Sequence, residues 1–229
     1  MFTKILTASM IVAFAGVAAA QNSAKPAAQP AKAEAKPAAP VKMNEAQTKF
    51  EQIKKLAGVW QSADGDKEGA PHTSAIYRVT SGGSAVAETL MPGTEHEMVT
   101  MYTVDGDSII MTHYCAAQNQ PRMKSKAGGP SNVIAFEFKD GTGLKSDKDG
   151  HMHSLVLTFK NDDAVSAAWQ YYVDGKPAAE HAVAFELVRV KDPAAAAKII
   201  TTAATSSCSA KSGATCCDSG VKTTEKGAN

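Results

Sequence analysis

Short runs of alternating apolar and polar residues, separated by turn signals, fill the chain from Ser74 to Lys191. Asp105-Gly106 stands directly between two such runs, which is typical of a tight β-hairpin. Alternation with period two predicts strands with one buried face. The predicted strands are 75–80, 84–90, 97–104, 108–115, 132–139, 152–159, 164–173 and 181–190. Many short strands in series favour an all-β, antiparallel barrel or sandwich.

One segment before these strands has helical spacing instead. Phe50, Ile53 and Leu56 share one face of a helix that begins at Glu45, and Gly58 can end it. The helix and the strands together are expected to form one domain over 43–192, which is near the usual size of a domain.

The first residues have the three parts of a secretory signal peptide. Lys4 gives a positive start, 5–17 is a short apolar stretch, and three alanines precede Gln21. We therefore predict a signal peptide over 1–20 and an exported protein, periplasmic or extracellular. Residues 21–42 are rich in Ala, Pro and Lys and are predicted to form a disordered linker, because they have little to bury.

The C-terminal segment 193–229 has low complexity and is predicted to be disordered as well. It holds Cys208, Cys216 and Cys217. Outside the cytosol such cysteines favour a disulfide, and Cys208 with either neighbour is easier geometrically than a bridge between adjacent cysteines. Metal capture or thiol exchange by this segment, or a bridge from it to Cys115, are the alternatives.

Charge argues against one class of partner. The chain has 24 basic and 23 acidic residues and a formal net charge of +1, so no basic field attracts nucleic acid. No segment after the signal peptide is long and apolar enough to be expected to span a membrane. The oligomeric state is left open.

Two residues at opposite ends of the predicted domain suggest a family. Gly58-Val59-Trp60 follows the helix, and Arg189 stands near the end of the last strand. With this order of features the chain resembles the lipocalin or calycin superfamily. The resemblance implies an antiparallel eight-stranded barrel with a short N-terminal helix, in which the Arg189 guanidinium packs over the Trp60 indole.

Several internal phrases also resemble a group of bacterial exported proteins of unknown function with a calycin-like fold. They are 81–90, 92–102, 113–123 and 151–153. This resemblance implies a fold and no reaction. The haem-binding nitrobindins are more distantly similar, through Gly-x-Trp and a late histidine, here His181.

Strand parity predicts which polar residues face the barrel interior. The three apolar rows on 108–115, 152–159 and 164–173 are expected to point inward. Four polar residues stand at the ends of these rows, namely His113, Cys115, His151 and His153. An eight-stranded barrel has room inside for side chains or one small ligand, so these residues are expected to line its mouth.

Apolar walls with a few polar groups favour a pocket for a small, partly apolar ligand. The predicted ligand-binding residues are His113, Asn119, Gln120, Arg122, His153 and Trp169. In this interpretation the apolar body packs on Trp169, His113 and His153 fix a polar head, and Arg122 bonds a carboxylate through two nitrogens.

Two alternatives use the same residues. His151 and His153 project together from a strand, and His113, Cys115 or His96 would complete a tetrahedral site for Zn or Cu. In a haem protein one histidine would hold the haem. Alternatively, the barrel is packed solid and serves as a structural or interaction module.

An enzyme is the less favoured class. The sequence has no nucleophile elbow, phosphate loop, dinucleotide fingerprint or zinc-protease motif. A catalytic pair of His113 and Cys115 would lack a third group to orient it. We assign no catalytic residue and leave the cofactor open.

Overall fold

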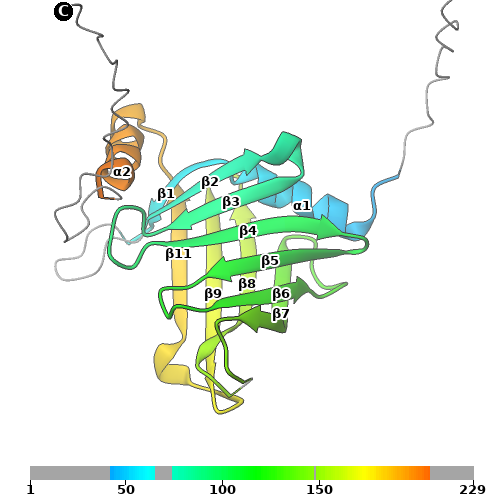
Figure 1. Cartoon of the computed structure of the whole chain (residues 1–229). Helices are drawn as coiled ribbons and strands as arrows, with labels where there is room; N and C mark the ends of the chain where they lie inside the picture. The colour runs from blue at the N-terminus through cyan, green and yellow to red at the C-terminus, as the bar shows by residue number, and fades with distance from the viewer. Residues whose placement is uncertain (1–41, 65–73, 147, 207–229) are drawn as a thin grey trace, which may run out of the picture. The chain divides into compact units, whose positions relative to one another are not determined.

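A computed structural model describes residues 42–64, 74–146 and 148–206. The predicted signal peptide, almost all of the predicted linker and the three tail cysteines lie outside these residues. The elements follow one another as shown in Figure 1: α1 (Glu45–Lys55), β1 (Gly58–Ser62), β2 (Ser74–Thr80), η1 (Ser81–Gly83), β3 (Ala85–Leu90), β4 (Met98–Asp105), β5 (Ser108–Tyr114), β6 (Gln120–Ser125), β7 (Val133–Thr142), β8 (His151–Asn161), β9 (Ala164–Val173), β10 (Lys176–Pro177), η2 (Ala179–His181), β11 (Val183–Arg189) and α2 (Pro193–Ser206).

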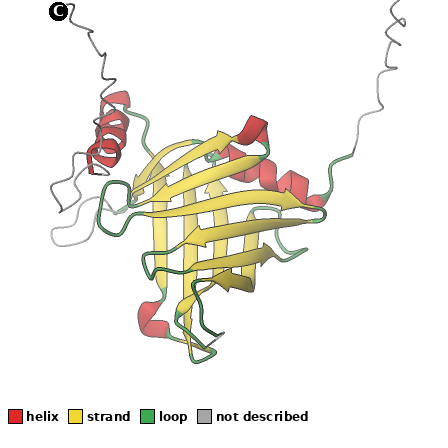
Figure 2. Ribbon diagram, viewed as in Figure 1, coloured by secondary structure: helices red, strands yellow, loops and turns green. Residues whose placement is uncertain are grey.

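The strands form a closed antiparallel barrel (Figures 1 and 2). Strands β1 to β9 pair in chain order, and β11 lies between β9 and β1 and closes the ring. In the described residues ten strands make the wall, and the two-residue β10 adds to the end of β9. The prediction of an all-β antiparallel barrel with a short N-terminal helix is confirmed, but the predicted number of eight strands is wrong.

The additional wall strands are β1 and β6, and both have weak alternation. The five residues of β1 follow α1 almost directly, and alternation did not predict them as a strand. In β6 only Pro121 and Met123 form the buried row, and a proline is uncommon inside a strand. The ladder between β5 and β6 ends at Arg122, next to Pro121, which has no N–H to donate.

Large side chains fill the barrel interior. The largest side chains that are less than 2% exposed are Trp60, Tyr102, Phe136, Ile53, Ile109, Met111, Met123, Ile134, Leu155, Leu157, Leu187 and His113. In β5 burial alternates as predicted, since Ile109, Met111 and His113 are buried while Ile110 and Thr112 are partly exposed. The interior is therefore a packed core along most of its length.

Helix α1 covers one end of this core. Asn44 and Gln47 form a capping box that satisfies the first amides of the helix. The buried residues Phe50 and Ile53 point toward the barrel, as their helical spacing predicted. The end is sealed by Arg189, whose guanidinium lies 4.4 Å from the Trp60 ring centroid, the contact that the resemblance implied.

Helix α2 occupies the first part of the segment that was predicted to be disordered. Asp192 caps it by accepting hydrogen bonds from the amides of Ala194 and Ala195 (3.1 and 3.3 Å). Pro193 stands at the first helical position, and a run of alanines follows. In the described residues no helix has both the length and the apolar character that a membrane crossing requires.

Candidate functional site

The candidate site lies at the barrel end opposite α1. Asn44, which caps α1, donates through Nδ2 to the carbonyl oxygen of Gly106 (2.9 Å). Helix α1 therefore contacts β4 and β5 at the end where the β4–β5 turn joins them. Met98 and His113 lie near the opposite ends of β4 and β5, at what we call the far end. Because the strands are antiparallel, the far end also receives the loops 91–97, 115–119, 143–150 and 174–182.

A buried carboxyl group lies inside the barrel on β3. Glu88 is 3% exposed, and its two oxygens accept hydrogen bonds from the hydroxyls of Tyr77 (2.6 Å) and Tyr102 (2.8 Å). The Thr100 hydroxyl also helps to stabilise its charged form. Burial raises the pKa of Glu88, and these three hydroxyl donors act in the opposite direction because they stabilise the carboxylate.

Thr100 connects this carboxyl group to His113. The Thr100 Oγ1 atom lies 2.9 Å from His113 Nδ1. A hydroxyl has one proton, so when Thr100 directs that proton toward Glu88, its oxygen accepts from a protonated Nδ1. Nε2 then carries a lone pair, and it is buried without a hydrogen-bond partner in the described part of the chain.

The surroundings keep this imidazole neutral. Burial lowers the pKa of His113 from 6.5 to about 4. The ring centroids of His113 and Trp169 lie 4.6 Å apart, so the indole forms one wall beside the imidazole. A neutral ring with Nδ1 bonded and Nε2 free can accept a hydrogen bond from a ligand or bind a metal ion.

A second buried acceptor lies nearby on the 115–119 loop. Asn119 is 4% exposed and donates through Nδ2 to the Gly150 carbonyl oxygen (2.8 Å), whereas its Oδ1 has no partner among the described residues. Its backbone carbonyl accepts from the Cys115 amide (3.0 Å). Burial raises the pKa of the Cys115 thiol, so the reactive thiolate is disfavoured.

Two predicted ligand-binding residues have other partners. Arg122 is exposed, and its Nε and Nη2 donate to the two carboxylate oxygens of Asp140 (2.5 and 2.6 Å). The pair of bonds that was expected for a ligand carboxylate is therefore made within the chain. Gln120 accepts through Oε1 from the Thr142 hydroxyl (2.8 Å).

His153 lies at an irregularity in β8. Ser154 pairs with Gln170 and Met152 pairs with Tyr171, so His153 is an additional residue in the ladder. The inward row of His151, His153 and Leu155 was predicted from strict alternation. The extra residue of the bulge breaks that alternation. The His153 ring instead stacks on Tyr172, with centroids 3.8 Å apart.

His151 and His153 contact each other. His151 Nε2 lies 3.0 Å from His153 Nδ1, and His151 Nδ1 lies 2.6 Å from the Asp149 carbonyl oxygen. Because a carbonyl only accepts, Nδ1 of His151 carries its proton and Nε2 accepts from His153. Both rings also contact Phe138.

The four predicted metal ligands do not all have the same neighbouring residues. His113 contacts Trp169 inside the barrel, and Cys115 begins the next loop, whereas His151 and His153 contact Phe138. Across residues 42–64, 74–146 and 148–206, no three His, Cys, Asp or Glu side chains are grouped so that they could hold a metal ion.

The interior partners of His113 were not predicted from the sequence. A signal for Glu88 was present, because it shares strand parity with Val86 and Leu90, which are both buried. A charged residue in an inward row needs polar partners, and Tyr77 and Tyr102 on the neighbouring strands supply them. Thr100 stands opposite His113 in the β4–β5 register, a pairing that the hairpin turn determines.

Two surface pockets border α1, at the end of the barrel away from His113. The larger, of about 280 Å³, is lined by Met43, Gln47, Phe50, Glu51, Lys54, Gly83, Ser84 and Val104. The other, of about 200 Å³, is lined by Gln52, Lys55, Leu56, Asn132, Phe159, Asn161 and Asp162. The ligand-binding residues predicted from sequence line neither of these pockets.

The fold and this site define a class of protein. The chain is a closed antiparallel β-barrel, compatible with a lipocalin-like fold, with a polar chain from Glu88 to His113 in its interior. Comparison with protein-family models and with curated protein sequences finds no match to this chain.

Proposed function

We propose that this protein binds a small, partly apolar molecule at the far end of the barrel and carries out no reaction on it. The observation that carries the proposal is His113 Nε2, a buried ring nitrogen without a hydrogen-bond partner among the described residues. Leaving such a group unpaired costs about 1–3 kcal/mol, which a ligand N–H or O–H would recover.

The polar chain behind His113 favours this role. Thr100 lies 2.9 Å from Nδ1, and in this proposal it accepts the Nδ1 proton, so that the imidazole faces a ligand with the lone pair of Nε2. Trp169 offers a flat apolar wall beside it. Met98 and Met111 belong to the core, and the partly buried Met152 packs against it. The flexible side chains of these methionines can move to admit a ligand.

These features specify the ligand more narrowly than the sequence did. It carries a hydroxyl or N–H donor for His113 and an apolar body for Trp169. A carboxylate head is not required, because Arg122 is already bonded to Asp140. We also propose that the protein belongs with the lipocalin-like exported proteins it resembles and acts outside the cytoplasm, on the basis of its first 20 residues.

Native mass spectrometry of the protein, purified from its export compartment without chelator or imidazole, tests the proposal. We expect a reproducible additional organic mass on the wild-type chain, and we expect His113→Leu to lose it while the circular dichroism spectrum is unchanged. His96→Leu is the matched control, because the His96 side chain is 67% exposed, and it should keep the mass.

The other outcomes distinguish the alternatives. A metal or haem mass that His113→Leu removes would favour a metal or haem protein, for which the Nε2 lone pair is equally suitable. A bare polypeptide mass, together with unchanged spectra when extracts of the compartment are added, would favour a packed structural module.

A further inference from the structure

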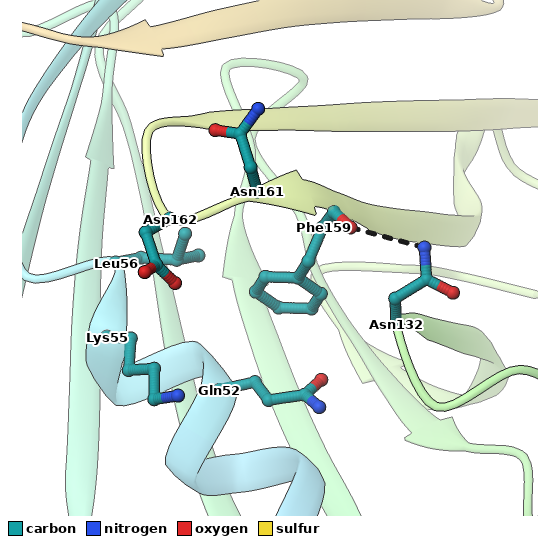
Figure 3. Close-up of a pocket in the computed structure, with 7 residues that line it drawn as sticks. All are labelled: Gln52, Lys55, Leu56, Asn132, Phe159, Asn161 and Asp162. Carbon is teal, nitrogen blue, oxygen red and sulfur yellow. Dashed lines mark hydrogen bonds between the residues drawn. The ribbon is translucent and has the colours of Figure 1, made fainter.

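A second site lies at the α1 end, in the pocket of about 200 Å³ shown in Figure 3. Phe159 forms its centre, and the polar side chains lie around the ring. The volume corresponds to about seven water molecules, which suits a ligand of the size of a single amino acid. The floor is apolar, since the partly exposed Phe159 and the buried Leu56 both contribute to it.

The pocket carries one charge of each sign. Lys55 comes from the last turn of α1 and Asp162 from the β8–β9 turn. Within the described ranges neither side chain forms an ion pair, although the backbone carbonyls of both residues accept from Arg189. Arg189 therefore fixes the two backbones that present an ammonium and a carboxylate to the same space.

Three amide side chains complete the polar lining, and internal bonds determine which of their groups are available. Gln52 donates through Nε2 to Ser131 (2.9 Å), and Asn132 donates through Nδ2 to Phe159 (3.2 Å). Their carbonyl oxygens are thus acceptors, and Gln52 Oε1 is buried without a partner in the described chain. Asn161 has the opposite orientation, because its Oδ1 accepts from the Asp163 amide (2.9 Å), which leaves its NH₂ group as a donor.

We propose that this pocket binds a zwitterionic small molecule with an apolar side group, the chemistry of a free apolar amino acid. The ligand ammonium lies toward Asp162 and the carbonyl oxygen of Gln52. Its carboxylate lies toward the Lys55 ammonium. The apolar group packs on Phe159. This site is separate from the one proposed at His113 and does not depend on it.

The first experiment compares three probes on the full chain, with binding followed through backbone amide shifts in NMR spectra. L-leucine carries both charges, isoamylamine lacks the carboxylate, and 4-methylpentanoate lacks the ammonium. We expect leucine to shift the amides of Gln52, Asn132 and Phe159 with millimolar affinity, and each analogue to bind about tenfold more weakly. Equal binding of leucine and either analogue, or no shift at these residues with millimolar leucine, would overturn the proposal.

The second experiment removes each charge in turn. Asp162→Asn and Lys55→Gln should each weaken leucine binding about tenfold. Asp174→Asn, in the exposed β9–β10 turn at the far end, and Lys54→Gln, on the other side of α1, make the same chemical changes and should leave the affinity unchanged. Equal losses in a variant and its control would show that leucine binds elsewhere.

Discussion

Replacing His113 by glutamine removes a buried base whose protonation opposes folding. In the folded protein the pKa of His113 is lowered to about 4, whereas in the unfolded chain it returns to the ordinary value of 6.5. Between these two pH values the unfolded chain binds more protons, so the free energy of unfolding of the wild type decreases as the pH falls. The decrease begins near pH 6.5 and is complete below about pH 4.

The size of the effect follows from the two pKa values. A pKa lowered from 6.5 to about 4 corresponds to about 3.4 kcal/mol, at about 1.36 kcal/mol for each pKa unit. At about pH 4.5 most of this loss, roughly 2.5 kcal/mol, is present. At pH 7 it is absent, because His113 is neutral in both states.

Urea unfolding at pH 7 and at about pH 4.5 measures the effect in the wild type and in His113→Gln. Other titrating groups contribute to both chains and cancel in the comparison. We expect acid to reduce the stability of the wild type by roughly 2.5 kcal/mol more than that of the variant. His96→Gln, at an exposed histidine, should follow the wild type. An acid-induced loss of equal size in wild type and His113→Gln would refute the assignment of a neutral, buried imidazole.

Three further predictions concern the barrel itself. Glu88→Leu leaves buried hydroxyls without their acceptor and should reduce the free energy of unfolding by about 3–5 kcal/mol in urea; a loss close to zero would contradict the buried network. Gly58→Ala should destabilise the fold by about 1–3 kcal/mol, because Gly58 has a φ of +134° and an added Cβ would lie 2.9 Å from Arg189 Nη1; an unchanged melting temperature would argue against this contact. Arg122→Ala removes an exposed ion pair with Asp140 and should change neither the urea midpoint nor ligand binding, so a lost ligand mass would restore Arg122 to the site.

The sequence predicted most of the barrel because burial alternates along its strands. Every strand predicted from alternation is found, with ends displaced by no more than a few residues. β6 was missed because its inward row has only two members, Pro121 and Met123, and a proline argues against a strand. Asp192 followed by Pro193 is a sequence signal for the start of a helix. The low complexity of the segment nevertheless led to a prediction of disorder.

The site was predicted less completely, because its chemistry depends on pairs between strands. Parity correctly placed His113 and Trp169 on inward faces, and they are in contact. Alternation within β8 could not show the bulge at His153, because the extra residue is recognised only when β8 is paired with β9. The partner of Arg122 also depends on register, because Asp140 is brought opposite it by the β6–β7 pairing.

The position of β11 has a consequence for the order in which the fold can form. Trp60 pairs with Arg189, so the first strand of the barrel receives one of its two neighbours only when the last strand is present. Until then the chain has two open edges, at β1 and β9, each with unpaired backbone groups. A long separation between paired strands slows folding, and open edges invite pairing with other chains. A chain that ends before Val183 would therefore present an open sheet in place of a barrel, and we expect it to associate with itself rather than to remain a monomer.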